Sequence, residues 1–232
     1  MSDKQAYLGM QTNYYDEFAS VWSIHYRDPV VGTYDLHEQW TDYDEYLFKG
    51  FDTNGLIALD YGCGPGRSII HYNNRFTRID GVDISAINLN KATDNCNANG
   101  IDVPLLYHTN GDSLDDIDDD TYDVVYSVIC LQHICSHEIR DNIFREAYRV
   151  LKPGGKLCFQ MGYGGKEYPT ASWQDDQFDA ASTNGHSDVS ITNEQDVIDD
   201  LEAIGFGSYL SDIRPTGPGD NHRNWIWIQV TK

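Results

Sequence analysis

The stretch that decides the fold is Leu59-Asp60-Tyr61-Gly62-Cys63-Gly64-Pro65-Gly66-Arg67. A short apolar run typical of a buried strand precedes it, and a helical pattern follows it. Three glycines between a strand and a helix permit a tight turn and let a ligand approach the backbone, because no Cβ stands in the way. The stretch therefore predicts a ligand-binding turn at the carboxyl end of a strand.

Beyond this turn, short apolar runs alternate with helical segments. We expect strands at residues 56–60, 78–83, 103–108, 122–128 and 156–161. We expect helices at residues 67–72, 87–99, 138–151 and 194–204, the last followed by two strands at 209–213 and 225–230. This alternation predicts an α/β fold, with a parallel sheet covered by helices on both faces.

Two segments depart from the alternation. Residues 1–50 are aromatic and acidic, with helical spacing in residues 14–22 and 35–48, and we expect them to form an N-terminal helical cap. Residues 51–232 are expected to form a single domain. Within it, residues 162–192 are rich in Gly, Ser and Asp, and we expect a lid loop there.

Composition excludes several functions. The 232 residues include 37 Asp and Glu against 16 Lys and Arg, a formal net charge of −21. Phosphate backbones and anionic membrane surfaces repel such a chain, so we expect neither nucleic acid nor membrane as a partner. The five scattered cysteines favour a reducing compartment, and the first residues show no apolar targeting segment, so we expect a cytoplasmic protein.

An acid at the end of the next expected strand, in Gly81-Val82-Asp83-Ile84-Ser85, is placed to accept both hydroxyls of a ribose. Two cofactor classes use such a turn. Dinucleotide sites carry G-x-G-x-x-G, whereas the spacing here is G-x-G-x-G with Asp60 in front, which would repel a pyrophosphate. A nicotinamide-dependent oxidoreductase is therefore the weaker alternative.

The chain resembles the class I S-adenosylmethionine-dependent methyltransferases, whose first motif is D/E-x-G-x-G-x-G. Asn110-Gly111-Asp112-Ser113 is similar to the adenine loop of that family, and Tyr122–Ser127 to its fourth strand. The resemblance implies S-adenosylmethionine as cofactor and a Rossmann-like sheet of seven strands, the seventh antiparallel. The cofactor-binding residues that it implies are Asp60, Gly62, Gly64, Gly66, Asp83, Ile84, Asp112, Ser113 and Ser127.

The acceptor side is less determined. His133 follows the fourth strand and is the candidate general base, since imidazole titrates near neutral pH, although a purely structural His133 is equally compatible with the sequence. His133 and His137 lack a third ligand nearby, so we expect no metal site. The candidate acceptor-binding residues are Tyr14, Tyr15, Trp22, Tyr26, Tyr163, Arg214 and His222.

The sequence lacks the motif N/D-P-P-Y/F, which DNA amino-methyltransferases carry after the fourth strand, and it offers no basic patch for RNA. We therefore expect a small-molecule acceptor: a sugar, phenol, carboxylate or amine. The alternative from another class is a non-catalytic regulatory subunit that binds S-adenosylmethionine without transferring its methyl group.

Overall fold

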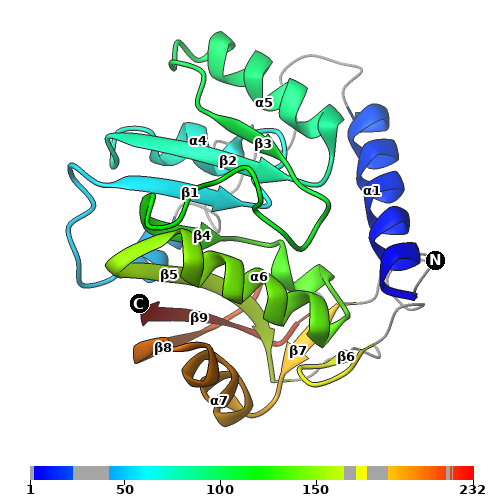
Figure 1. Cartoon of the computed structure of the whole chain (residues 1–232), viewed down its shortest axis with the longest axis vertical. Coiled ribbons are helices and arrows are strands. Elements are labelled where there is room, and N and C mark those ends of the chain that lie inside the picture. Colours follow the sequence, from blue (N-terminus) through cyan, green and yellow to red (C-terminus); the bar gives the residue numbers. More distant parts are fainter. Residues whose placement is uncertain (1–2, 23–41, 165–170, 177–187, 218–219, 221) are drawn as a thin grey trace.

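A computed structural model describes residues 3–22, 42–164, 171–176, 188–217, 220 and 222–232. Its centre is one twisted sheet with helices on both faces (Figure 1). The strands are β1 (Ile57–Tyr61), β2 (Arg78–Asp83), β3 (Leu106–His108), β4 (Tyr122–Ser127), β5 (Leu151–Tyr163), β6 (Ala171–Ser172), β7 (Val189–Ile191), β8 (Gly207–Pro215) and β9 (Asn224–Thr231). The helices are α1 (Asp3–Trp22), α3 (Tyr43–Leu47), α4 (Arg67–Tyr72), α5 (Ala86–Ala98), α6 (His137–Val150) and α7 (Glu194–Ile204), with a short 3₁₀ helix, η2, at Leu131–His133.

The order of the parallel strands places the glycine turn at the middle of the sheet. Strands run in the order β3-β2-β1-β4-β5, all parallel, and β9 joins β5 in antiparallel pairing with β8 outside it. The chain order reverses between β1 and β4, which is where open α/β sheets bind their ligands. The predicted Rossmann-like fold, with its antiparallel last strand, is confirmed.

The strand count differs from the predicted seven. The structure describes nine strands, because β6 and β7 form within residues 162–192, where we expected only a loop. Both are two or three residues long and exist through pairing with a neighbour: β7 lies beside the end of β5, with Gly162 opposite Ser190. Strand β3 is shorter than predicted because residues 103–105, which include Pro104, precede it as irregular chain.

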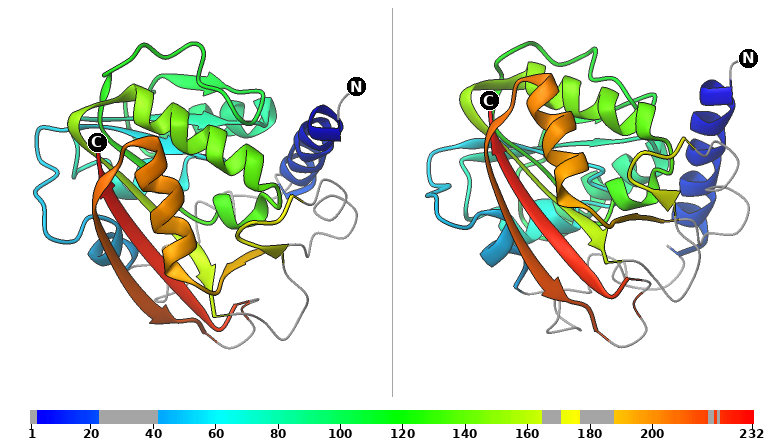
Figure 2. Two further views of the ribbon diagram at one scale, coloured as in Figure 1. Left: turned by 60° about the horizontal axis from the view of Figure 1, so that its bottom comes forward. Right: turned by 90° about the horizontal axis from the view of Figure 1, so that it is seen from below.

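Two apolar clusters, one on each face, hold the helices on the sheet. Side chains of α6 and α7 pack on one face with Leu59, Val125 and Phe159. Side chains of α3, α4 and α5 pack on the other face with Ala58, Val124 and Trp227. Figure 2 shows α7 lying along β8 and β9 on the same side as α6. The helices thus cover both faces of the sheet, and the loops at the carboxyl ends of the strands remain available to form a site.

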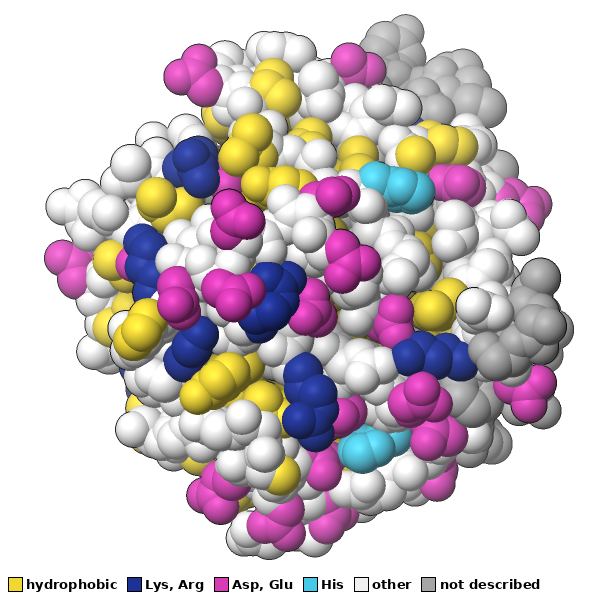
Figure 3. Space-filling model, in the orientation of Figure 1, with side chains coloured by type: hydrophobic (Ala, Val, Ile, Leu, Met, Phe, Trp, Pro, Cys, Tyr) yellow, Lys and Arg dark blue, Asp and Glu magenta, His cyan; other side chains and the backbone are white. Residues whose placement is uncertain are grey.

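Helix α1 lies apart from both helical layers. It stands across the carboxyl ends of β1 and β2, beside the start of α5 (Figure 1). The surface in Figure 3 shows acidic side chains spread among Lys and Arg instead of gathered in one patch. Among the described residues, no helix is both long and apolar enough to cross a bilayer.

Candidate active site

A cavity of about 410 Å³ opens between α1 and the carboxyl ends of β1, β2 and β4. Its floor is the glycine turn, where Gly62, Gly64 and Gly66 all have positive φ angles (76°, 52° and 86°). Side chains at such angles are strained, so the turn favours glycine. A Cβ built on Gly64 meets no atom within 4 Å, and Gly64 lines the cavity. The turn therefore presents bare backbone to a ligand.

Asp83 braces this turn from the end of β2. Its carboxylate accepts hydrogen bonds from the backbone N–H groups of Gly64 and Ser85, each at 2.8 Å, and it lines the cavity. Burial raises the pKa of Asp83, against the lowering effect of these two N–H groups. A carboxylate has about four acceptor positions, so acceptor capacity remains for a ligand's hydroxyl groups.

Asp60 lies under the turn and is buried. Burial raises the pKa of this carboxyl group to about 8, against the opposing effect of Arg67. Its Oδ2 atom has no hydrogen-bond partner among the described residues. The carboxyl group also lies beside the buried Tyr126, whose side-chain interaction lowers its pKa, and it does not line the cavity.

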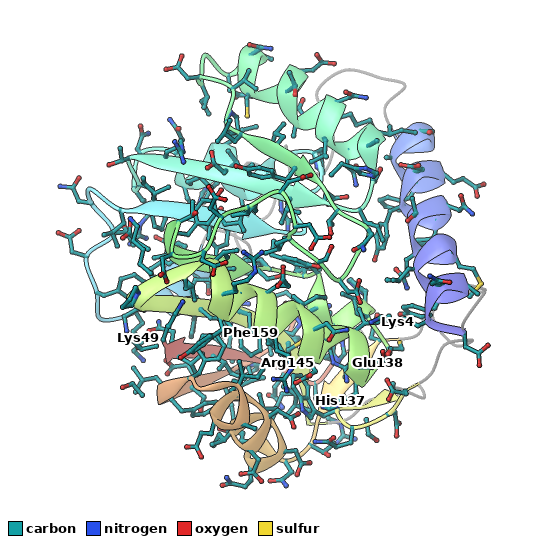
Figure 4. All side chains as sticks on the ribbon, viewed as in Figure 1. Lys4, Lys49, His137, Glu138, Arg145 and Phe159 are labelled. Carbon is teal, nitrogen blue, oxygen red and sulfur yellow. The ribbon has the colours of Figure 1, made fainter. Side chains whose placement is uncertain are left out.

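Helix α1 forms the opposite wall of the cavity through Tyr14, Tyr15 and Phe18. Its amino-terminal half is fixed by Tyr7, whose hydroxyl oxygen accepts a hydrogen bond from the backbone N–H of Cys135 at 2.9 Å. Lys4 forms ion pairs with Asp112 and Glu138, and the amino-terminal end of α1, with Lys4, lies beside the start of α6 in Figure 4.

The carboxyl-terminal half of α1 is fixed to α5. Ser85 donates its hydroxyl hydrogen bond to Asp16, and Lys91 donates to the carbonyl oxygen of Ala19. The two ends of α1 are thus tied to opposite sides of the cavity, and its aromatic middle lines the space between them.

At the end of the cavity next to β4, a histidine side chain contacts a carboxylate. Nδ1 of His133 lies 2.7 Å from Oδ1 of Asp188, and both residues line the cavity. The Asp188 side chain is 3% exposed and that of His133 31% exposed. A hydrogen bond at Nδ1 to a carboxylate selects the tautomer that carries its proton there, so the lone pair is on Nε2.

Cys130 lies beside this pair. Burial raises the pKa of its thiol to about 12, so the thiol stays protonated near neutral pH and is a poor nucleophile. The arrangement therefore offers general-base chemistry at an imidazole, in a cavity whose other end is a glycine turn braced by the carboxylate of Asp83.

A family model described as a methyltransferase domain matches residues 58–155, from β1 to the first part of β5. Over these residues the chain is similar to methyltransferase domains, and its fold is that of the class I S-adenosylmethionine-dependent methyltransferases. S-Adenosylmethionine is the cofactor of this class, and the bare glycine turn and Asp83 fit its amino-acid end and its ribose hydroxyl groups.

Two curated relatives resemble this methyltransferase domain. Phosphoethanolamine N-methyltransferase 2 of Caenorhabditis elegans is 31% identical over 114 residues, which are 47% of this chain and 25% of the relative. Malonyl-[acyl-carrier protein] O-methyltransferase of Salmonella typhimurium is 31% identical over 105 residues, 44% of this chain and 37% of the relative. The matched part is thus well under half the length of either relative.

Among solved structures, phosphoethanolamine N-methyltransferase 2 of Haemonchus contortus superposes with a TM-score of 0.64 at 17% identity. The match covers 94% of this chain and 60% of that one, which was determined with phosphomonomethylethanolamine and S-adenosylhomocysteine bound. At this identity the likeness establishes the fold.

The methyltransferase cavity brings together about half of the residues that the sequence predicted for the site. Those that line it are Gly62, Gly64, Asp83, Ile84, His133, Tyr14 and Tyr15. Asp60 and Gly66 support the turn from below, Gly66 by packing its Cα side against Ala92. Ser127 is buried behind the turn, where its hydroxyl donates to the carbonyl oxygen of Tyr61.

Asp112 and Ser113 do not line the cavity. Asp112 pairs with Lys4 and Asn142, and Ser113 bonds to Asn110 and Asp115 on the outer side of the loop. Their neighbour Gly111 does line it, and its carbonyl oxygen accepts a hydrogen bond from the Tyr61 hydroxyl. The backbone of this loop therefore lines the cavity, whereas the carboxylate of Asp112 pairs with Lys4 of α1.

Three predicted acceptor residues also lie elsewhere. Tyr163 packs against the cluster under α6 and α7. Arg214 pairs with Asp42 at 2.9 Å and lies over the ring of Trp225, on the opposite face of the sheet. His222 is buried behind Asp188.

Tyr26 and the side chain of Trp22 lie outside the described residues. In the part of the chain that the structure describes, no group of three or more His, Cys, Asp or Glu side chains is arranged to hold a metal ion.

Sequence reasoning missed Asp188, Gln11 and Lys91, all of which line the cavity. Asp188 stands just before the strand Val189–Ile191, so an acid ahead of a short run with Val and Ile was the available signal. That signal alone does not say which strand the run will join.

Proposed function

We propose that this chain transfers the methyl group of S-adenosylmethionine to a small-molecule acceptor, with His133 as the general base. The observation that carries the proposal is the 2.7 Å contact between His133 and Asp188 in the same cavity as the glycine turn and Asp83. The pair places a carboxylate where it would stabilise the imidazolium that forms when His133 accepts a proton.

The roles follow from the geometry. S-Adenosylmethionine, when bound, supplies an electrophilic methyl group on a sulfonium. Asp83 and the turn around Gly64 hold the cofactor, and the α1 aromatics exclude water and orient the acceptor. Nε2 of His133 takes the proton that the acceptor heteroatom loses as its bond to the methyl carbon forms, and Asp188 stabilises the resulting imidazolium.

The acceptor class is supported by charge and by size. A cavity of about 410 Å³, on a chain with net charge −21, suits a small molecule and not a nucleic acid. The relatives named above are a phosphoethanolamine N-methyltransferase and a malonyl-carrier O-methyltransferase, so both amine and oxygen acceptors occur among similar domains. The match to a methyltransferase model favours this activity over the nicotinamide-dependent alternative.

The test has two stages. Titration calorimetry with S-adenosylhomocysteine should show binding by the wild type that Asp83→Ala weakens strongly, and no binding by the wild type would refute the cofactor assignment. A panel of amines, phenols, sugars and carboxylates is then screened for production of S-adenosylhomocysteine. Tight cofactor binding without transfer to any member would favour the regulatory subunit instead. His133→Gln should lower turnover at least about 100-fold while changing cofactor affinity little.

A further inference from the structure

His222 is a buried histidine that the proposed reaction does not yet use. Its side chain is fully buried, and the residue lies two positions before the start of β9. The ring lies against the backbone of Gly162, where a Cβ would stand 2.1 Å from two of the ring atoms, so glycine at that position makes room for the imidazole. Neither ring nitrogen has a hydrogen-bond partner among the described residues. Such a group is costly to bury unless it has a function.

The β8–β9 hairpin aims this ring. The backbone N–H of His222 donates to Asp220 at 2.8 Å, and the His222 carbonyl oxygen accepts from the hydroxyl of Thr216. These bonds fix the residue from both sides, so the ring direction is set by the turn and by the gap at Gly162.

The ring faces the second oxygen of Asp188. Nε2 of His222 lies 3.5 Å from Oδ2 of Asp188, while Oδ1 of the same carboxylate binds His133 at 2.7 Å. Asp188, 3% exposed, thus lies between two imidazoles, one at the cavity wall and one in the interior. Three elements far apart in the sequence meet here: η2, the residue before β7, and the segment just before β9.

We propose that His222 is a positioning residue, which acts through Asp188 to hold His133 in the tautomer with its proton on Nδ1. We call His133, Asp188 and His222 the trio. Contacts at both carboxylate oxygens help to fix the plane of Asp188 and with it the alignment of Oδ1 with His133. The consequence for methyl transfer rests on the proposed function above; the tautomer itself does not.

Charged groups on the elements packed against the trio make contacts of their own. Asp220 on the same hairpin binds the backbone of His222, and the buried Arg140 of α6 binds the carbonyl oxygens of Ile134 and Trp173.

The decisive experiment is ¹⁵N NMR of the histidine rings in the whole protein, which needs no acceptor. In the wild type, neutral His133 should show the Nδ1–H tautomer. His222→Leu, which fills the space without a donor, should give a mixture of both tautomers, and His222→Gln, which keeps a donor toward Asp188, should restore most of the Nδ1–H form. If His222→Leu does not fold, His222→Met replaces it, because its unbranched side chain adapts to the same space.

The chain provides an internal control. His137 binds Asp200 through Nε2 at 2.8 Å, so its neutral form should be the opposite tautomer. Asp200→Asn should disturb His137 and leave His133 unchanged, whereas Asp188→Asn should do the reverse. A wild-type His133 in the Nε2–H form, or an unchanged Nδ1–H fraction in the folded variant without a donor at residue 222, would overturn the proposal.

Kinetics separate this proposal from the proposed function. With an acceptor found in the panel above, His222→Leu should lower kcat about tenfold or more, with KM and S-adenosylhomocysteine affinity within about twofold of wild type, and should move the acid limb of the pH–rate profile. If the wild type methylates no acceptor, the proposed function fails, while the tautomer measurement still decides whether the trio operates.

Discussion

Gly64 offers the sharpest test of where the cofactor lies. It combines a φ of 52° with open space around a built Cβ, and it lines the cavity. In Gly64→Ala the new methyl group would therefore contact no protein atom, and its only internal cost is the left-handed backbone, about 1–2 kcal/mol for a residue with a Cβ.

Gly100 provides a matched control. It follows α5 with a φ of 67°, and a built Cβ there also meets nothing within 4 Å. Gly100→Ala should cost the same 1–2 kcal/mol of folding stability, a shift of roughly 2–4 °C in Tm for each kcal/mol in a chain of this size. Gly100 does not line the cavity, so its substitution should leave ligand binding unchanged.

The assay is titration calorimetry with S-adenosylhomocysteine on both variants, with thermal unfolding measured beside it. We expect the two variants to lose similar stability, and Gly64→Ala alone to bind at least tenfold more weakly, which corresponds to about 1.4 kcal/mol. Wild-type affinity in Gly64→Ala would refute the assignment of the turn as the cofactor cradle. Equal weakening in both variants would show that the loss of ligand affinity follows the loss of folding stability and not a contact at the glycine turn.

Three further predictions follow from other contacts. Asp83→Asn should weaken S-adenosylhomocysteine binding at least about tenfold by calorimetry, because its amide NH₂ group would face the backbone N–H of Gly64 or Ser85. Asn88→Ala, which removes a contact of 3.5 Å to Asp83, should weaken binding less, and equal weakening in the two variants would contradict the role of Asp83. Since burial raises the pKa of Asp60 to about 8, the folded protein binds that proton more tightly than the unfolded chain does. This contribution to folding stability is complete below about pH 4 and is lost as the pH rises to about 8. The free energy of unfolding in urea should therefore depend less on pH in Asp60→Asn than in the wild type, and parallel pH curves for the two proteins would refute the assignment. Arg140→Met should destabilise the protein by about 2 kcal/mol or more in the same assay, because the carbonyl oxygens of Ile134 and Trp173 lose their buried donor. Arg145→Met, on the exposed face of α6, should change the free energy of unfolding by less than about 0.5 kcal/mol.

The elements that could be predicted from the sequence are those with a local signal. The glycine turn is flanked by its own strand and helix, and β2, α4 and α7 begin and end where the pattern predicts. Asp83 could be placed because it ends a strand, and in a parallel sheet the carboxyl ends of neighbouring strands meet at one edge.

The remaining residues depend on contacts between distant segments. Asp188 reaches His133 across 55 positions, through a three-residue strand too short to show a period. Asp112 was expected to face the cavity, and only the position of α1 shows that Lys4 pairs with it. Arg214 and His222 flank one hairpin, yet they lie on opposite sides of the sheet, because the turn between them and the gap at Gly162 set their directions. Such choices are made by tertiary packing, which no local pattern records.

Helix α1 is held by apolar as well as polar contacts. Tyr7 is fully buried in the core cluster under α6 and α7, and Leu8 and Met10 pack against that cluster. The polar contacts are the partly exposed ion pair of Lys4 with Asp112, worth about 1 kcal/mol at most, and hydrogen bonds from Cys135 to Tyr7 and from Ser85 to Asp16, each about 1 kcal/mol net. The middle of the helix faces the cavity with Tyr14 and Tyr15 and has little core beneath it. We therefore expect α1 to stay anchored at Tyr7, and a bound ligand to add apolar contacts at the middle of the helix.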